Sequence, residues 1–68
     1  MEIELRLAER VKRFRKERQW SQEELADRAG LHRTFVSQIE RATKRSTIVT
    51  VERVARALEV TCGQLLDE

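Results

Sequence analysis

The chain contains no proline and only two glycines among its 68 residues, so little in it can interrupt a helix. Alanine, leucine, glutamate, arginine and glutamine are abundant, and these residues have high intrinsic helix propensities. No segment alternates apolar and polar residues in the way that a half-buried strand does. The sequence therefore predicts an all-α fold.

Apolar spacing and capping residues locate the first two helices. The first helix is predicted over residues 2–18, where apolar side chains recur at helical intervals on one face. Ser21 and Glu24 form a predicted capping box, in which the Ser21 hydroxyl accepts from the Glu24 amide and the Glu24 side chain reaches back to Ser21. Gly30 is the expected stop of this second helix.

Three further helices are expected after Gly30. Two of them are predicted over residues 33–41 and 48–58, and a second capping box of Thr61 and Gln64 opens a short last one. No linker, repeat or low-complexity segment separates the helices. A chain of this length can hold one small domain, so we expect residues 1–68 to form a single compact five-helix bundle.

The inventory of reactive side chains argues against an enzyme. The single Cys62 cannot close an intrachain disulfide, and together with the single His32 it cannot supply the four ligands of a zinc site. The chain has no tyrosine, no glycine-rich phosphate loop and no available base for a nucleophile. We expect no catalytic residues, no metal and no cofactor.

No feature of the sequence predicts export or membrane insertion. No apolar run approaches the ~20 residues that span a bilayer, and the start lacks the basic and apolar regions of a signal peptide. We therefore expect a cytoplasmic protein without membrane association.

Positive charge is concentrated in two places although the net charge is only +2. Residues 1–20 carry seven basic and four acidic side chains, and residues 41–45 carry three basic and no acidic ones. This distribution is typical of a protein with one face toward phosphate, as in nucleic acid. For the first segment, a solvated helix surface explains the pattern equally well.

The predicted third helix has an outer face suited to DNA. Two helices joined by a short turn that contains Gly30 have the layout of a helix-turn-helix. On a helical wheel the outward arc holds Arg33, Thr34, Ser37, Gln38 and Arg41, whereas Phe35, Val36 and Ile39 fall opposite, toward the core. The outward arc contains no acidic residue. Its residue types form hydrogen bonds with base edges in the major groove.

Three runs of the sequence resemble a known family. They cover residues 21–31, 33–41 and 46–60, and they contain the capping box, the turn glycine and the Ile-Glu-Arg end of the third helix. The chain resembles the Xre family of helix-turn-helix regulators, the group of phage Cro and repressor DNA-binding domains, over about residues 5–66. Within that family it looks most like the small controller proteins of restriction-modification systems.

The resemblance implies a lambda-repressor-like fold, a homodimer and a palindromic double-stranded DNA operator. Base-reading positions of the family fall on Arg33, Thr34 and Gln38, with Ser37 beside them. Phosphate-contacting positions fall on Gln22, Lys44 and Arg45. Arg15 and Glu40 match a structural ion pair between the first helix and the end of the third. RNA polymerase becomes a further partner if the protein activates transcription.

The sequence departs from the family pattern in its loops. His32 replaces the usual Ser or Thr at the start of the third helix and is a poorer cap, so a solvated side chain or a phosphate contact is expected instead. Gln19 and Ala42 stand where glycine is frequent, and Ser46 where proline is frequent. A left-handed backbone at Gln19 or Ala42 would cost roughly 1 kcal/mol relative to glycine, so these loops can take another turn.

The C-terminal third contains the candidate dimer contacts. Val49 lies about 160° from the core-facing Val51 on the wheel of its helix, and it has no evident partner within the chain. Cys62 matches a dimer-contact position of the phage repressors, and Leu65 and Leu66 either extend this surface or close the core. The alternative function is an antitoxin-like or adaptor module whose third helix contacts a protein.

Overall fold

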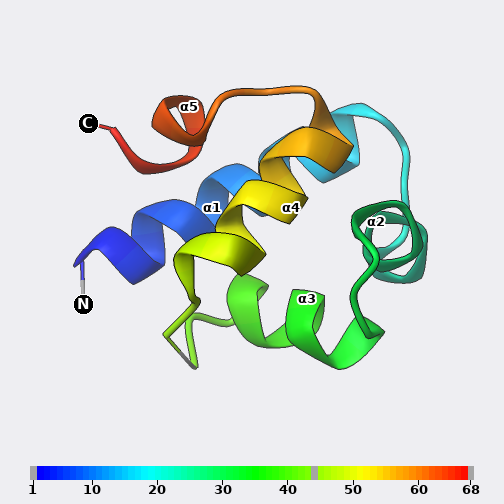
Figure 1. Cartoon of the computed structure of the whole chain (residues 1–68), viewed down its shortest axis with the longest axis horizontal. Coiled ribbons are helices and arrows are strands. Elements are labelled where there is room, and N and C mark those ends of the chain that lie inside the picture. Colours follow the sequence, from blue (N-terminus) through cyan, green and yellow to red (C-terminus); the bar gives the residue numbers. More distant parts are fainter. Residues whose placement is uncertain (1, 44, 68) are drawn as a thin grey trace.

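The computed structural model describes residues 2–43 and 45–67, in which helices are connected by turns and short loops and no strand occurs (Figure 1). The helices are α1 (Glu2–Glu17), α2 (Gln22–Ala29), α3 (Arg33–Glu40), α4 (Ile48–Leu58) and α5 (Cys62–Leu66). The predicted all-α, five-helix fold is confirmed. The first and third predicted helices each end one residue early.

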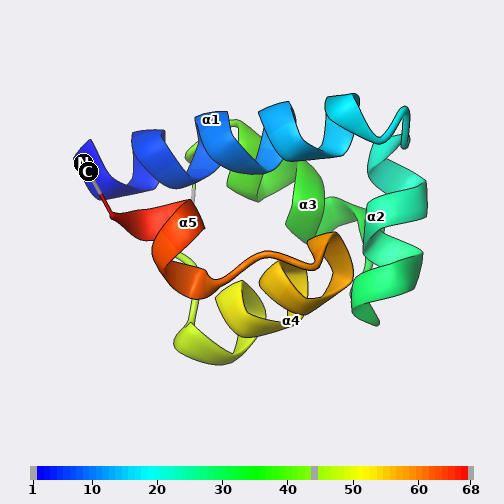
Figure 2. The same cartoon turned by 90° about the horizontal axis from the view of Figure 1, so that it is seen from above.

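The long helix α1 spans the molecule, and the other helices are arranged around it (Figure 2). Helix α2 lies at the C-terminal end of α1, and α5 lies beside the N-terminal half of α1. Helix α3 packs against α1 and α2 and forms the lower edge of Figure 1, with its outer face uncovered. The fully buried centre contains side chains from every helix: Val11, Leu25, Val36, Val54, Leu58 and Leu65.

Side-chain caps begin four of the helices. The Ser21 hydroxyl accepts from the Glu24 amide at 3.0 Å, but the Glu24 carboxylate accepts from Arg28 at 2.6 Å instead of closing the expected box. Thr61 and Gln64 form both halves of theirs. The structure also corrects the expectation for His32, because its Nδ1 atom accepts from the Thr34 amide at 3.1 Å and so caps α3.

Three residues other than glycine adopt the left-handed backbone conformation at helix ends. Gln19 has φ 59°, Ala42 has φ 55° and Glu59 has φ 59°, alongside Gly30 at φ 69°. The expectation that the loops at Gln19 and Ala42 avoid a left-handed backbone is therefore wrong. Each accepts a strain of roughly 1 kcal/mol because a Cβ atom crowds the following carbonyl.

Several arginines cap the C-terminal ends of helices far along the chain. Arg6 donates to the Leu66 carbonyl at 2.6 Å, and Arg18 donates to the Leu58 carbonyl at 2.6 Å. A cation at a helix C-terminus satisfies an otherwise unpaired carbonyl and interacts favourably with the helix dipole. Part of the positive charge of α1 is thus used within the fold and is neither simply solvated nor free for phosphate.

Candidate nucleic-acid interface

The outer face of α3 presents polar and basic side chains to solvent. Arg33, Thr34 and Arg41 are exposed, and Ser37 and Gln38 are half-buried. The one acidic residue of this helix, Glu40, is buried on the opposite side. The structure therefore brings the four predicted base-reading residues onto one helix, whose outward surface carries no carboxylate.

Phe35 is the exception to the predicted core face of α3. Its side chain is 44% exposed, whereas Val36 and Ile39 are buried as expected. The reason is geometric: the buried arc of α3 runs from Ile39 through Val36 to Glu40, and Phe35 lies at the edge of that arc. A shallow hollow of about 120 Å³ adjoins it, lined in part by Gln38 and Arg45.

A buried ion pair connects α3 to α1. Arg15 Nε lies 2.6 Å from Glu40 Oε2, and Arg15 Nη2 lies 3.0 Å from Glu40 Oε1, so the pair between these residues is bidentate. The remaining Arg15 nitrogen, Nη1, donates to the Trp20 carbonyl at 2.7 Å. Planar arginine forks hold carboxylates in a fixed orientation. The pair therefore fixes the C-terminal end of α3 relative to α1.

Gln22 also contacts this ion pair. Its Nε2 atom donates to Glu40 Oε1 at 3.1 Å, although sequence analysis assigned it to DNA phosphate. An amide nitrogen carries two hydrogens, so one donor remains at the N-terminal end of α2. No local pattern signals the contact with Glu40, because the two residues are 18 positions apart.

The basic loop between α3 and α4 borders the same face. Arg45 is exposed there, and the predicted phosphate contact Lys44 lies outside the described residues. A hydrogen bond from its own backbone lowers the pKa of the Glu4 carboxyl, and Arg45 lowers it further by a smaller amount. The positive charge of Arg45 therefore acts on the Glu4 carboxyl in α1 as well as on the surface of its own loop.

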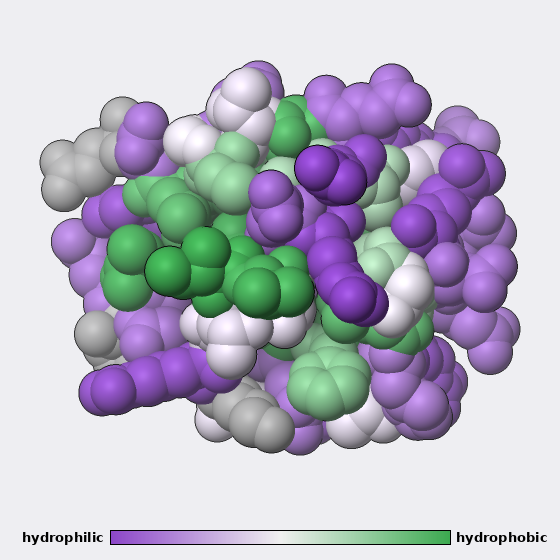
Figure 3. Space-filling model, in the orientation of Figure 1, coloured by the Kyte–Doolittle hydropathy of each residue, from purple (hydrophilic) through white to green (hydrophobic). Residues whose placement is uncertain are grey.

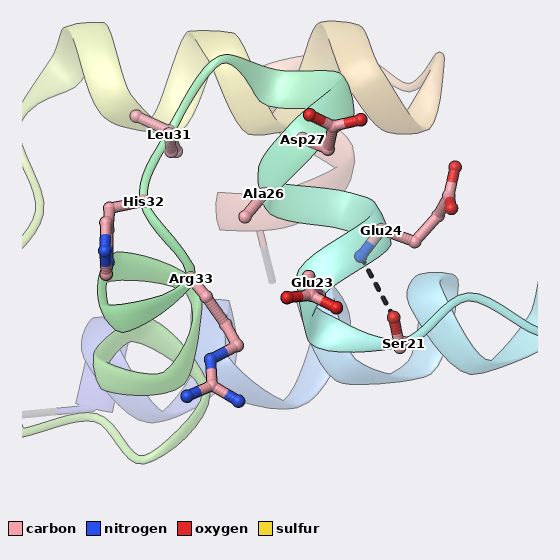
Figure 4. A pocket seen from close by; sticks show the side chains of 8 residues that line it. All are labelled: Ser21, Glu23, Glu24, Ala26, Asp27, Leu31, His32 and Arg33. Atoms are coloured by element: carbon pink, nitrogen blue, oxygen red, sulfur yellow. Dashed lines mark hydrogen bonds between the residues drawn. The ribbon is translucent and has the colours of Figure 1, made fainter.

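A hollow of about 740 Å³ lies between α2 and the start of α3. It is acidic, because Glu23, Glu24 and Asp27 line it. Figure 4 shows Glu23 on α2 and Arg33 at the start of α3 on the two sides of it, with Asp27 farther along α2. Carboxylates repel phosphate. The hollow is therefore unfavourable for phosphate, although Arg33 adds one positive charge to its lining.

A second surface is apolar and lies away from α3. Figure 3 shows hydrophobic side chains gathered over the start of α4. Ile48 is 86% exposed and Val49 is 60% exposed, and a hollow of about 280 Å³ beside Ile48 is lined by Cys62 and Leu66. Sequence analysis identified Val49 but missed Ile48, which is the first residue of α4.

Leu65 does not belong to this surface. Its side chain is 0% exposed and packs in the hydrophobic core. The structure thus favours the core alternative for Leu65, and we leave it out of the candidate dimer contacts.

The described residues hold neither a candidate metal site nor a helix that could span a membrane. Within residues 2–43 and 45–67, no group of three or more His, Cys, Asp or Glu side chains is placed to hold a metal ion. Among the helices of this part of the chain, none is long and apolar enough to cross a membrane.

Comparison with known proteins identifies relatives of this arrangement. A helix-turn-helix family model matches residues 11–65. A hypothetical transcription factor of Neisseria meningitidis is 45% identical over 60 residues, which are 88% of this chain and 57% of that relative. The control protein C.SmaI of Serratia marcescens is 39% identical over 66 residues, which are 97% of this chain and 79% of C.SmaI.

The likeness extends to a solved complex with DNA. The crystal structure of SinR, the master regulator for biofilm formation, in complex with DNA superposes with a TM-score of 0.85 at 37% identity. The match covers 90% of this chain and 98% of the SinR chain in that complex.

Proposed function

We propose that this chain, which belongs to the Xre-type helix-turn-helix family of DNA-binding transcriptional regulators, acts as a restriction-modification controller. In this role it binds a palindromic operator as a homodimer. The matches to the control proteins C.SmaI and C.BamHI support the controller role, since they reach 39% and 38% identity over 66 residues each. The family consists of DNA-binding regulators and not of enzymes.

The acid-free outer face of α3 is the observation that carries this proposal. It offers a guanidinium, a hydroxyl and an amide on one face, at Arg33, Thr34 and Gln38. Arginine can form paired hydrogen bonds with guanine O6 and N7, and glutamine can form them with adenine N6 and N7. The bidentate bond between Arg15 and Glu40 holds this helix in a fixed orientation, as base recognition requires.

The proposed backbone contacts flank this face on two sides. Gln22 lies at the first residue of α2, where free amides and the helix dipole favour an anion. Arg45 is exposed in the loop after α3, and Lys44 precedes it in the chain. Contacts on both sides of a recognition helix set its position in the groove without reading sequence.

The apolar surface at the start of α4 is the proposed contact between two copies. Val49 and Ile48 are largely exposed there, beside the hollow lined by Cys62 and Leu66. Two helix-turn-helix domains on a palindrome must place their recognition helices about one DNA turn, ~34 Å, apart.

A footprint on the DNA upstream of its own gene tests the proposal. We expect two protected half-sites related by two-fold symmetry, with centres about one helical turn apart. Binding of a duplex from that site should weaken steeply between about 50 and 200 mM salt, with a slope set by the number of neutralised phosphates.

An antitoxin-like or adaptor module would give a different result. Its outer α3 face would bind a protein partner at salt concentrations that abolish association with DNA. A uniform footprint, or affinities that are equal for operator and unrelated duplexes, would contradict the regulator proposal and favour this second function.

A further inference from the structure

Phe35 is an aromatic side chain on the helix that otherwise presents polar groups outward. It lies at the edge of the exposed face of α3, next to Gln38 on the helical surface, and it is 44% exposed. Its neighbour Val36, by contrast, is fully buried. A large apolar group is thus partly presented at the edge of an otherwise polar surface.

The surroundings of Phe35 form a small apolar recess at the proposed DNA face. The recess of about 120 Å³ has Phe35 and Ile39 as apolar walls, and Gln38 and Arg45 line it as well. Gln38 is a proposed base contact and Arg45 a proposed backbone contact. A group that enters this recess thus lies between a base edge and a phosphate.

The edges of base pairs in the major groove offer one apolar group, the C5-methyl of thymine, and phenylalanine is among the side chains that contact it. We propose that Phe35 reads a thymine methyl group of the operator and thereby sets sequence preference at one base pair. This inference rests on the proposed function, and it adds a base-contacting residue that forms no hydrogen bond.

The location of Phe35 argues against a role in joining two copies. The apolar hollow beside Cys62 and Ile48 is a separate depression, and Arg45 and Ser46 line both. A basic and a hydroxyl side chain therefore lie between Phe35 and the proposed dimer surface. An aromatic wedge between base pairs is also disfavoured, because more than half of the Phe35 side chain is covered by its own protein.

Replacement of single thymines by deoxyuridine tests the inference, since it removes only the methyl group. In the footprinted operator, each thymine is replaced in turn, and the dissociation constants are measured by fluorescence anisotropy. Wild-type protein should bind about 4-fold more weakly at one position per half-site, the change expected for losing one buried methyl-sized group. The Phe35→Ala variant should bind the thymine and deoxyuridine duplexes equally well.

Two matched experiments separate this contact from general weakening. Arg45 lines the same recess, so Arg45→Ala is the matched control. This variant should bind all duplexes less tightly but keep the thymine preference. In a second experiment, the sensitive position carries cytosine or 5-methylcytosine, whose methyl group occupies the same place in the groove as that of thymine. Wild-type protein should bind the 5-methylcytosine duplex more tightly than the cytosine duplex. Phe35→Ala should bind both equally well. If Phe35→Ala does not fold, as judged by circular dichroism, Phe35→Gln takes its place.

The possible results separate the proposed function from the proposed role of Phe35. Absence of any specific binding by wild-type protein would overturn the proposed function. Specific binding with equal affinity for thymine and deoxyuridine at every position would overturn the role of Phe35 alone. An unchanged thymine preference in the folded Phe35 variant would do the same.

Discussion

The Arg15 guanidinium and the Glu40 carboxylate meet in the interior, with N–O distances of 2.6 and 3.0 Å and only 1% of the Glu40 side chain exposed. One residue belongs to α1 and the other is the last residue of α3, so the pair connects the long scaffold helix to the recognition helix. Transfer of two charges from water into a protein is costly, and such pairs often add little net stability. The value of this one therefore lies in orientation.

Loss of one member of this pair should destabilise the fold strongly. Glu40→Gln leaves the Arg15 charge buried without its counterion, and we expect the free energy of unfolding to fall by about 3 kcal/mol or more in urea denaturation. Replacement of both residues, Arg15→Met with Glu40→Leu, should recover part of this loss because no charge then remains buried.

The exposed ion pair between Glu24 and Arg28 provides a matched control. Both side chains are about half exposed, and their N–O distance is also 2.6 Å. Glu24→Gln should change the free energy of unfolding by less than about 1 kcal/mol, because solvent screens exposed pairs. If the effects of Arg15→Met and Glu40→Leu, each measured alone, add up strictly to that of the double variant, the buried pair is energetically uncoupled.

The base-reading and backbone roles should separate in binding measurements. Arg33→Ala is expected to cost about 1 to 3 kcal/mol of binding free energy and to relax preference at one base pair. Lys44→Ala and Arg45→Ala should weaken binding to all sequences alike and reduce the salt slope by about one each. Competition binding with a library of single-base operator variants measures both effects. If Arg33→Ala loses the same binding free energy with every operator variant, Arg33 does not read a base.

The left-handed turn at Ala42 predicts a gain in stability from glycine. Ala42→Gly should raise the free energy of unfolding by up to about 1 kcal/mol, since the strain at φ 55° exceeds the added freedom of the unfolded chain. Gly30→Ala is the reciprocal control and should lower it by about 1 kcal/mol. A Cβ atom at Gly30 would lie 3.6 Å from Arg53 Nη1, which is ordinary contact, so only the backbone conformation is tested there. Thermal melts of both variants check the two signs.

Local signals explain why the helices could be predicted from the sequence. Ser21 and Thr61 cap helices through hydrogen bonds within three residues, and Gly30 ends one through its own conformation. Such signals are contained in a few neighbouring positions. The pair of Arg15 and Glu40 could be anticipated only through family resemblance, because 25 residues separate its members.

Features that depend on distant segments could not be predicted in this way. Arg18 binds the Leu58 carbonyl 40 positions away, and a charged residue on a helix gives no hint of that target. The helical wheel placed Phe35 in the core because it is apolar. Whether such a side chain at the edge of the buried arc is covered depends on how the neighbouring helices pack, and here 44% of it stays exposed.

The apolar surface at the start of α4 leads to the last prediction, which concerns assembly. Val49 is 60% exposed, and a β-branched apolar side chain there gains most if a partner removes it from water. Val49→Asp should therefore give a folded monomer in sedimentation velocity. Operator affinity should fall together with dimerisation, because each half-site is then bound without the avidity of a linked pair.

Cys62→Asp should have the same effect if the hollow beside Ile48 forms part of the contact. Its side chain is half-buried, so circular dichroism must first establish that the variant is folded. Leu5→Asp is the matched control, since Leu5 is an exposed apolar residue of α1 that does not line this hollow. The control should remain a dimer with unchanged operator binding. Wild-type protein that sediments as a monomer at high micromolar concentration, or dimers that persist in both Val49→Asp and folded Cys62→Asp, would exclude this surface as the interface.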